Sequence, residues 1–385
     1  MTEKVGRPRL SCCAVNRRLA LLATAFLVSA PAALAGAPQV NGRAYLVENG
    51  NGEVLVHRHD RERLPIASIT KLMTVLVTLQ HARLDDVVTV SRTAAAVGES
   101  SIYLRKGDQL TVRDLVEAAL IQSANNAAVA LAEYVGGSQA AFVAMMNAEA
   151  HKLGLHDTHF ANPDGLDAFG HYSSAHDVTR LARIAMKNPV IRGIVRRTTA
   201  TIAGGRVLTT WNDLLGRFPG VFGVKTGHTA AAGWSEVAAA RAHGVTIYAT
   251  VLGAPTREGR NAILEELLAW GISRYRTVNV VSSGRIYATA AAPYGRRPLS
   301  LVAAARASRI VRVDRLLVER VVAPAAVSLP VRKGQRLGEV SVYAGPKLIA
   351  RRPLVATRSI ARPGFVGRTE WYMGRTLHHV AGWFA

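Results

Sequence analysis

Apolar residues in the first part of the chain follow two periods, one typical of strands and the other of helices. Alternating runs flank Asn49-Gly50-Asn51-Gly52, a sequence that favours a tight β-hairpin turn. Two further apolar stretches within Trp234–Leu252 meet at His243-Gly244 and predict a second pair of strands. The alanine-rich segments Leu115–Tyr134 and Gln139–Leu153 have helical patterns. Strands at both ends with helices between them predict an α+β domain whose sheet joins distant segments.

After about Asn279 the pattern changes to short runs of Val and Ala that Gly, Pro and Arg interrupt. Runs of this kind predict short strands. Examples are Arg309–Val313, Val318–Val322 and Val340–Tyr343. We therefore expect a small all-β domain over residues 277–366, following the α+β domain over residues 36–276.

The tail, residues 367–385, predicts a short amphipathic helix. Apolar side chains recur there at helical spacing, at Met373, Leu377, Val380 and Phe384. A helix of this length is too short to span a membrane. Two alternatives stay open: the helix lies in a membrane interface, or it packs on the β domain.

The N-terminal residues 1–35 have the pattern of a cleaved secretory signal peptide. Arg17-Arg18 precede the apolar stretch Leu19–Ala35, which ends in small residues before Gly36. The stretch is short and contains Pro31, so a membrane-spanning anchor is the weaker alternative. We expect export to the periplasm or the extracytoplasmic face. Both cysteines lie in this leader, so the exported protein would have no disulfide bond.

Basic residues are concentrated in the predicted β domain. Residues 277–385 contain eighteen Lys plus Arg and four acids, a net charge of +14, whereas residues 36–276 contain twenty-five and twenty-one. Such a surface attracts polyanions, which for an exported protein are an anionic membrane surface and the acidic polymers of the envelope. A solvated, arginine-rich face explains the charge equally well. The export signal and the lack of a motif with interleaved aromatic residues argue against nucleic acid.

Three short motifs, far apart in the chain, together describe a serine acyl-transfer site. They are Ser68-Ile-Thr-Lys71, Ser123-Ala-Asn125 and Lys225-Thr226-Gly227. A serine and a lysine three residues apart share one face of a helix, and the apolar run Leu72–Val77 predicts that this helix is buried. The lysine amine can then take the proton of the serine hydroxyl.

The other two motifs supply the remaining groups of such a site. Ser123 offers a second hydroxyl for proton relay, and Asn125 offers an amide that can hold a substrate peptide. Lys225 and Thr226 can hold a carboxylate, and Gly227 permits a close approach of the backbone. No cofactor is required for this chemistry.

The lysine at both motif positions is informative, because the chain has forty arginines and only eight lysines. Arginine does not give up its proton in a protein, so a general base in this position must be lysine. This argument favours Lys71 as the base. It is weaker for Lys225, since a carboxylate accepts either cation.

Motifs of this kind form the signature of penicillin-binding proteins and class A β-lactamases. The chain resembles the low-molecular-mass penicillin-binding proteins, which act as D-Ala-D-Ala carboxypeptidases of peptidoglycan. The likeness covers roughly residues 40–275 and includes segments beyond the motifs. These segments are Asn162–Asp167, His171–Asp177, Gly223–Thr229 and Ala232–Trp234.

The resemblance implies a β-lactamase/transpeptidase-like fold, in which an antiparallel sheet packs with helices and carries a helical subdomain. It implies peptidoglycan stem peptides as substrates and β-lactam antibiotics as inhibitors. It also implies that Ser68 is the nucleophile and that the N–H groups of Ser68 and His228 form the oxyanion hole.

Two other functions compete with the carboxypeptidase. The first is a serine β-lactamase on the same fold, which in class A needs a glutamate to activate water; no Glu-x-x-Leu-Asn segment lies between Ser123 and Lys225. The second is a catalytically idle envelope-binding protein, which the complete set of catalytic residue types argues against. The sequence has no Gly-x-Ser-x-Gly and no His-Glu-x-x-His, so we expect neither an α/β-hydrolase nor a zinc peptidase, and no metal site.

Overall fold

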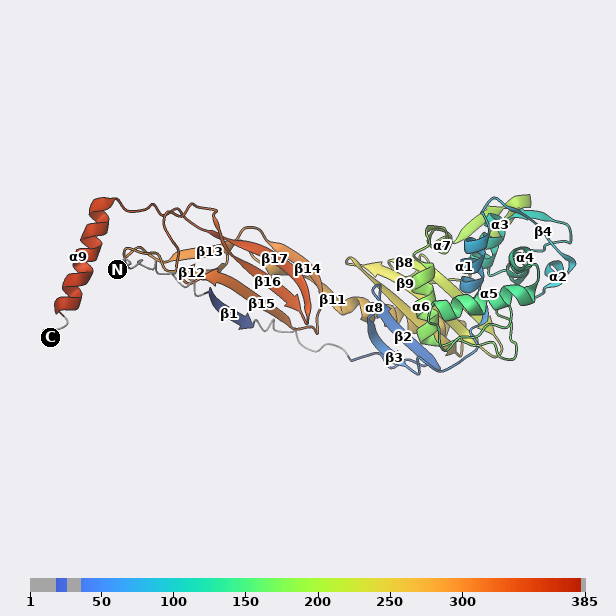
Figure 1. Cartoon of the computed structure of the whole chain (residues 1–385). Helices are drawn as coiled ribbons and strands as arrows, with labels where there is room; N and C mark the ends of the chain where they lie inside the picture. The colour runs from blue at the N-terminus through green and yellow to red at the C-terminus, as the bar shows by residue number, and fades with distance from the viewer. Residues whose placement is uncertain (1–18, 26–35, 382–385) are drawn as a thin grey trace, which may run out of the picture. The chain divides into compact units, whose positions relative to one another are not determined.

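The computed structural model describes residues 19–25 and 36–381, with side chains described for residues 36–373 (Figure 1). The chain forms two compact units. One spans Ala33–Tyr275, and the other contains Arg276–Ala385 together with strand β1 (Leu19–Ala25).

A five-stranded antiparallel sheet forms the centre of the first unit. Its strand order is β3-β2-β10-β9-β8. The strands are β2 (Ala44–Asn49), β3 (Val54–Arg58), β8 (Val221–Thr229), β9 (Gly233–Ala242) and β10 (Val245–Ala254). Both strand pairs expected from the sequence are confirmed, and β10 lies beside β2 although the two are far apart in the chain. Strand β8 is left at one edge of the sheet.

Helices cover both faces of this sheet. Helix α8 (Arg257–Ser273) packs on one face, where its leucines join the core that contains Val47 of β2. Helices α1 (Lys71–His81) and α6 (Ala175–Ala185) belong to the other core, which contains the neighbouring Leu46. Successive strand residues thus enter different cores, as the period of two in a strand requires.

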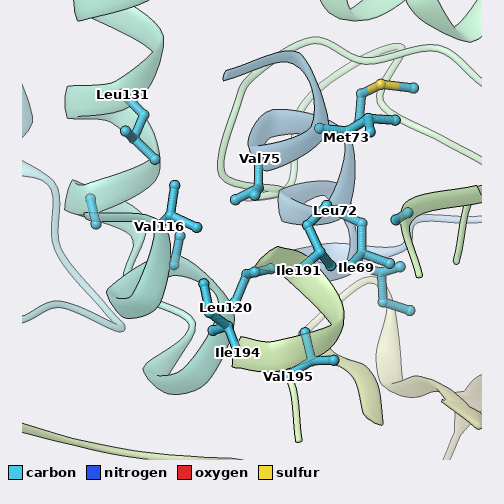
Figure 2. Packing of buried hydrophobic residues seen from close by; sticks show 14 of the residues in the cluster. Ile69, Leu72, Met73, Val75, Val116, Leu120, Leu131, Ile191, Ile194 and Val195 are labelled. Atoms are coloured by element: carbon cyan, nitrogen blue, oxygen red, sulfur yellow. The ribbon is translucent and has the colours of Figure 1, made fainter. Parts of the chain in front are cut away.

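A helical subdomain extends the second of these cores. Its elements are α2 (Arg92–Ala96), α3 (Val112–Glu117), α4 (Asn125–Gly136), α5 (Gln139–Lys152), α7 (Pro189–Ile194) and the short strand pairs β4–β5 (Val87–Thr89, Gln109–Thr111) and β6–β7 (Thr199–Ile202, Arg206–Thr209). Figure 2 shows apolar side chains of α1, including Leu72 and Val75, in one cluster with Leu131 of α4 and Ile191 of α7. Every residue of α1 from Lys71 to Thr78 is buried. This helix is therefore held from all sides.

The predicted continuous helix Leu115–Tyr134 is wrong at its centre. Helix α3 passes into a single π-helical turn (Ala118–Gln122), and the chain then breaks at Ser123, whose φ of +64° lies in the left-handed region. Helix α4 starts afresh at Asn125. The alanine-rich pattern continues across the break, so it gave no signal of the interruption. The break brings the Ser123 motif to the end of one helix and the start of the next.

The second unit is the predicted small all-β domain. Six strands pair in the order β1-β15-β16-β17-β13-β12, and β11 pairs with β14. The strands after β1 are β11 (Tyr275–Val281), β12 (Ile286–Ala290), β13 (Leu299–Ala303), β14 (Ala307–Arg312), β15 (Leu317–Pro324), β16 (Arg336–Ala344) and β17 (Lys347–Ala356). Alternate residues of β15 are buried, and three of them, Leu317, Val321 and Ala323, belong to this unit's own apolar core.

Helix α9 (Phe365–Ala381) ends the described chain. The ring of Trp371 packs edge-on against Tyr294 of the β domain, with centroids 5.4 Å apart. Phe365, Val366 and Met373 remain exposed. The contact of Trp371 favours the packed alternative for this part of the helix, while the predicted apolar positions 377, 380 and 384 lie outside the residues whose side chains are described.

Most of the predicted signal peptide lies outside the described residues. Its described part, Leu19–Ala25, forms β1 and pairs antiparallel with β15. Cleavage remains a prediction. Among the described residues, no single helix is long and apolar enough to cross a membrane, and the pair α4–α5, which meets that composition test, is bent by 87°.

The stability of the first unit is predicted to depend on Phe142, which is completely buried on α5. Phe142→Ala removes an aromatic ring from a packed core and should lower the free energy of unfolding by about 3–5 kcal/mol. Urea unfolding followed by tryptophan fluorescence measures the change. Phe169→Ala is the matched control, since Phe169 is fully exposed and its loss should change stability by less than about 0.5 kcal/mol. Equal effects of the two substitutions would contradict the assignment of Phe142 to the core.

Candidate active site

Ser68 lies in a tight 3₁₀ turn, Ala67–Thr70, that leads directly into α1. The sequence predicted this serine in the first turn of a buried helix, and the structure refines that first turn to 3₁₀ geometry. The residue before it, Ala67, has a φ of +48°, which is unusual for a residue with a side chain. Backbone of this kind is concentrated at functional sites, where the surrounding structure enforces it.

Lys71, the first residue of α1, places its amine beside the Ser68 hydroxyl. Its Nζ lies 2.7 Å from Ser68 Oγ, 2.7 Å from Asn125 Oδ1 and 2.6 Å from the main-chain oxygen of Asp164. Burial lowers the pKa of Lys71 to about 7, although the carboxylates of Asp164 and Glu99 oppose the shift. A neutral amine can still donate to Asn125 and Asp164 while its lone pair faces the serine hydroxyl. Lys71 is thus built to accept a proton near neutral pH.

Asn125, at the start of α4, ties Lys71 to the next segment of the chain. Its side-chain oxygen accepts the bond from Lys71, and its Nδ2 donates to the main-chain oxygen of Gly98 at 3.3 Å. One amide hydrogen is left for another partner. The adjacent Asn126 accepts a hydrogen bond from the main chain of Ile102, which gives it a structural role.

Ser123 and Lys225 form a second serine–lysine pair. Lys225 Nζ donates to Ser123 Oγ at 2.9 Å and to the main-chain oxygen of Thr226 at 3.0 Å. Lys225 is buried, and both burial and the nearby charge of Lys71 hold its pKa well below the usual range. The cation expected from the sequence therefore contacts Ser123 directly and does not lie at the surface of the cleft.

The remaining motif residues line a cleft of about 240 Å³ together with Ser68 and Ser123. Thr226, Gly227 and His228 come from β8, whose position at the sheet edge leaves its outer backbone groups without a neighbouring strand. A Cβ added at Gly227 would lie only 2.7 Å from the main-chain oxygen of Ile66. Only glycine lets this strand approach the turn that carries Ser68, as the sequence predicted.

The loop over residues 162–167 completes the site from the other side. Asn162 fixes it by accepting from Gly165 N at 2.7 Å and donating to Leu166 O at 2.8 Å. His171 receives a hydrogen bond from Ala161 N on Nδ1, so its Nε2 carries the proton and donates to Thr70 Oγ1 at 2.8 Å. Burial lowers the pKa of His171 to about 4. This histidine stays neutral and orders the loop.

Acids of the same loop are committed to structural bonds. Asp164 accepts from Leu166 N at 3.1 Å through its carboxylate. Asp167 accepts from Thr229 Oγ1 at 2.6 Å and from Ala231 N at 3.2 Å. These bonds commit the carboxylate of Asp164 to its own loop and that of Asp167 to the end of β8 and the turn after it. They argue against a β-lactamase water base there. Within the described part of the chain, no three His, Cys, Asp or Glu side chains are grouped closely enough to hold a metal ion.

Five further residues outside the three motifs line the cleft: Glu99, Ser100, Trp211, Trp234 and Arg260. Glu99 has a φ of +60° and precedes Ser100, which also lines the cleft. Arg260 is buried on α8, and its guanidinium lies 5.8 Å from the centre of the Trp234 ring. Only the tertiary fold brings these five residues into one cleft with Ser68. Of these residues, the sequence indicated Trp234 alone, within a segment that resembles the penicillin-binding proteins.

Comparison with known proteins agrees with this geometry. The family model described as D-alanyl-D-alanine carboxypeptidase matches residues 31–256. D-alanyl-D-alanine carboxypeptidase DacA of Escherichia coli (strain K12) is 32% identical, and the match covers 96% of this chain and 98% of that protein.

Solved structures give the same result. Penicillin binding protein 6B from Escherichia coli is 30% identical, with a TM-score of 0.63, and the match covers 86% of this chain and 99% of that one. Penicillin-Binding Protein D2 from Listeria monocytogenes, solved in its ampicillin-bound form, is 32% identical with a TM-score of 0.56 over 60% of this chain and 98% of that one. The chain belongs to the D-alanyl-D-alanine carboxypeptidase family, and its fold is that of the low-molecular-mass penicillin-binding proteins.

Proposed function

We propose that this enzyme removes the terminal D-alanine from peptidoglycan stem peptides through an acyl-enzyme on Ser68. The observation that carries the proposal is the 2.7 Å contact between the buried amine of Lys71 and Ser68 Oγ. In the first step Lys71 takes the hydroxyl proton, and the serine oxygen attacks the carbonyl carbon between the two D-alanines. The N–H groups of Ser68 and His228 would stabilise the oxyanion.

The second serine–lysine pair serves the leaving group. When the tetrahedral intermediate collapses, the peptide C–N bond breaks and the leaving amine needs a proton. Ser123 supplies this proton from its hydroxyl and takes a proton in turn from Lys225, whose amine it contacts. Water then attacks the ester on Ser68, which releases the shortened peptide and returns the proton to the serine.

Substrate contacts divide between the two walls of the cleft. Thr226 and Gly227 on the edge strand β8 face the terminal carboxylate, and the charge of Arg260, which lines the same cleft, favours that anion. The remaining amide hydrogen of Asn125 is assigned to the peptide backbone of the acyl half. A β-lactam shares the amide carbonyl and the carboxylate of this substrate, and its amide is strained. It would therefore acylate Ser68 and inhibit the enzyme.

Ser68→Ala tests the nucleophile. The wild-type protein should gain the mass of one fluorescent penicillin and should release one alanine from a pentapeptide stem, while folded Ser68→Ala should do neither. Intact-mass analysis of the protein measures the first result, and mass spectrometry of the peptide measures the second. Ser101→Ala provides a matched control, because Ser101 is a nearby serine outside the proposed machinery. Label retained on folded Ser68→Ala would assign the acylated residue elsewhere.

Lys71→Arg tests the base. Arginine keeps the positive charge and does not lose its proton, so penicillin acylation should fall by about a hundredfold or more while the protein stays folded. For the wild type, the neutral amine is the active form, so the acylation rate should rise with pH and level off above about 7. Stopped-flow fluorescence between pH 5 and 9 measures this. A rate independent of pH across that range would show that Lys71 acts only as a positioning cation.

We infer that residues 1–35 direct export and that the enzyme acts in the periplasm or at the extracytoplasmic face. The family's substrate is outside the cytoplasm, and the leader has the composition of a signal peptide. We further infer that the basic β domain holds the enzyme at an anionic membrane surface. Its support is the excess of basic residues in 277–385 and the exposed apolar residues of α9, such as Phe365 and Met373.

Vesicle sedimentation separates the two contributions. The full mature chain should bind vesicles that contain anionic lipid and should be released between about 0.15 and 0.5 M salt if charge dominates, since the screening length is about 8 Å at physiological salt. Replacing the exposed residues Arg332, Lys333 and Arg336 by Gln should weaken this binding. Salt-resistant binding that is lost on removing Trp371–Ala385 would assign the anchor to α9. If neither the full chain nor the chain without Trp371–Ala385 binds these vesicles, the arginines are a solvated face.

A further inference from the structure

A buried carboxylate lies directly behind the strand that carries the Lys-Thr-Gly motif. Glu236 is on β9, opposite Thr226 of β8 in the antiparallel register. Residues opposed in this way have their side chains on the same face of the sheet. The side chain of Glu236 has no exposed surface. An acid in this position is unexpected, because burying a charge without strong compensation is costly.

The compensation around Glu236 is incomplete. Arg260 Nε lies 3.0 Å from Glu236 Oε2, and both side chains are buried. Even so, within the described residues neither carboxylate oxygen of Glu236 accepts a hydrogen bond. Asp213 is different, since it accepts bonds from Arg257 at 2.8 Å and from Asn261 at 2.9 Å. Glu236 is thus the less well held of the two acids that contact Arg260.

The charged groups around Glu236 come from three elements. Arg257 and Arg260 are on α8, Asp213 is in the segment before β8, and Lys225 is on β8. His228, also on β8, stacks on Trp234 with ring centroids 4.0 Å apart. Burial, with a smaller contribution from the charge of Asp213, raises the pKa of Glu236 to about 7, although Arg260, Lys225 and Arg257 oppose the shift.

Protonation of Glu236 would change the charge at one end of the cleft. Arg260 lines the cleft beside Thr226, at the end where the substrate carboxylate is proposed to bind. With both acids ionised, Arg257 and Arg260 are balanced by Asp213 and Glu236. With Glu236 protonated, this group carries one net positive charge. Because Glu236 and Arg260 are both buried, the change of charge at this pair acts on the cleft with little screening.

We propose that Glu236 is a positioning residue whose protonation strengthens recognition of the substrate's terminal carboxylate by Arg260. This inference rests on the proposed function, because it requires a substrate that ends in a carboxylate. By linkage, a bound carboxylate in turn favours the protonated form of Glu236. The pH demand at this end is opposite to that at Ser68, where Lys71 must lose a proton.

The test compares two peptides that differ only at the end, one with a terminal D-Ala-D-Ala carboxylate and one with the carboxamide. The ratio of their kcat/KM values cancels the titration of Lys71, which both substrates need equally. In the wild type this ratio should fall by about tenfold as the pH rises from about 6 to 8.5, the scale expected for one partly buried charge. Release of D-alanine or D-alaninamide is measured by mass spectrometry.

Glu236→Gln should remove this pH dependence and hold the ratio near its low-pH value. Glu48→Gln is the matched control, since Glu48 is also buried in the sheet and paired with an arginine, Arg183, at 2.8 Å. It should keep the wild-type profile. An unchanged pH dependence in Glu236→Gln would overturn the inference and assign the effect to another group such as Lys225.

Two outcomes separate this inference from the proposed function. If the wild type neither hydrolyses the peptide nor binds penicillin on Ser68, the proposed function fails. If it does both while the substrate ratio is independent of pH, the proposed function stands and the role of Glu236 is overturned. The wild-type ratio gives this answer even if Glu236→Gln does not fold.

Discussion

The desolvation of a single amine organises this active site. Lys71 lies at the start of a helix that is buried on all sides, so its charged form loses the water that would stabilise it. Its three contacts are all with oxygens that carry no full charge: a hydroxyl, an amide oxygen and a main-chain carbonyl. A carboxylate at bonding distance would stabilise the ammonium and abolish the base. Asp164 illustrates the point, because it presents its carbonyl to Lys71 and bonds its carboxylate to Leu166 N.

The other features of the site follow from bringing partners to this amine. The chain must break at Ser123 for Asn125 to begin a new helix and reach Lys71. Gly227 must lack a side chain for the edge strand to approach the turn before α1. The same is true of Gly165, where an added Cβ would overlap the main-chain oxygen of Ala67. The packed helical core maintains the strained backbone of these segments, because it fixes α1 whether or not a substrate is bound.

The sequence predicted those parts of the site that depend on residue type and local spacing. A serine and a lysine one helical turn apart, and a lysine retained in an arginine-rich chain, are chemical choices that are readable without a fold. The break at Ser123 was missed because alanine-rich segments on both sides are equally helical. Arg260 and Glu236 were missed for another reason. Arg260 is one of several charged residues in α8, and Glu236 is a single acid in an apolar strand pattern. Only the packing of α8 against β9 brings the two together behind the cleft.

The two ends of the cleft therefore use buried charge in opposite ways. At Ser68 the protein surrounds a lysine with neutral oxygens, so that burial keeps the amine able to accept a proton. At Thr226 it pairs the buried Arg260 with Asp213 and Glu236, so that positive charge persists where an anion must bind. Lys71 must lose its proton while Arg260, which lines the cleft of about 240 Å³ together with Ser68, keeps its charge. The two demands are compatible because an arginine keeps its proton inside a protein, whereas burial lowers the pKa of Lys71 to about 7.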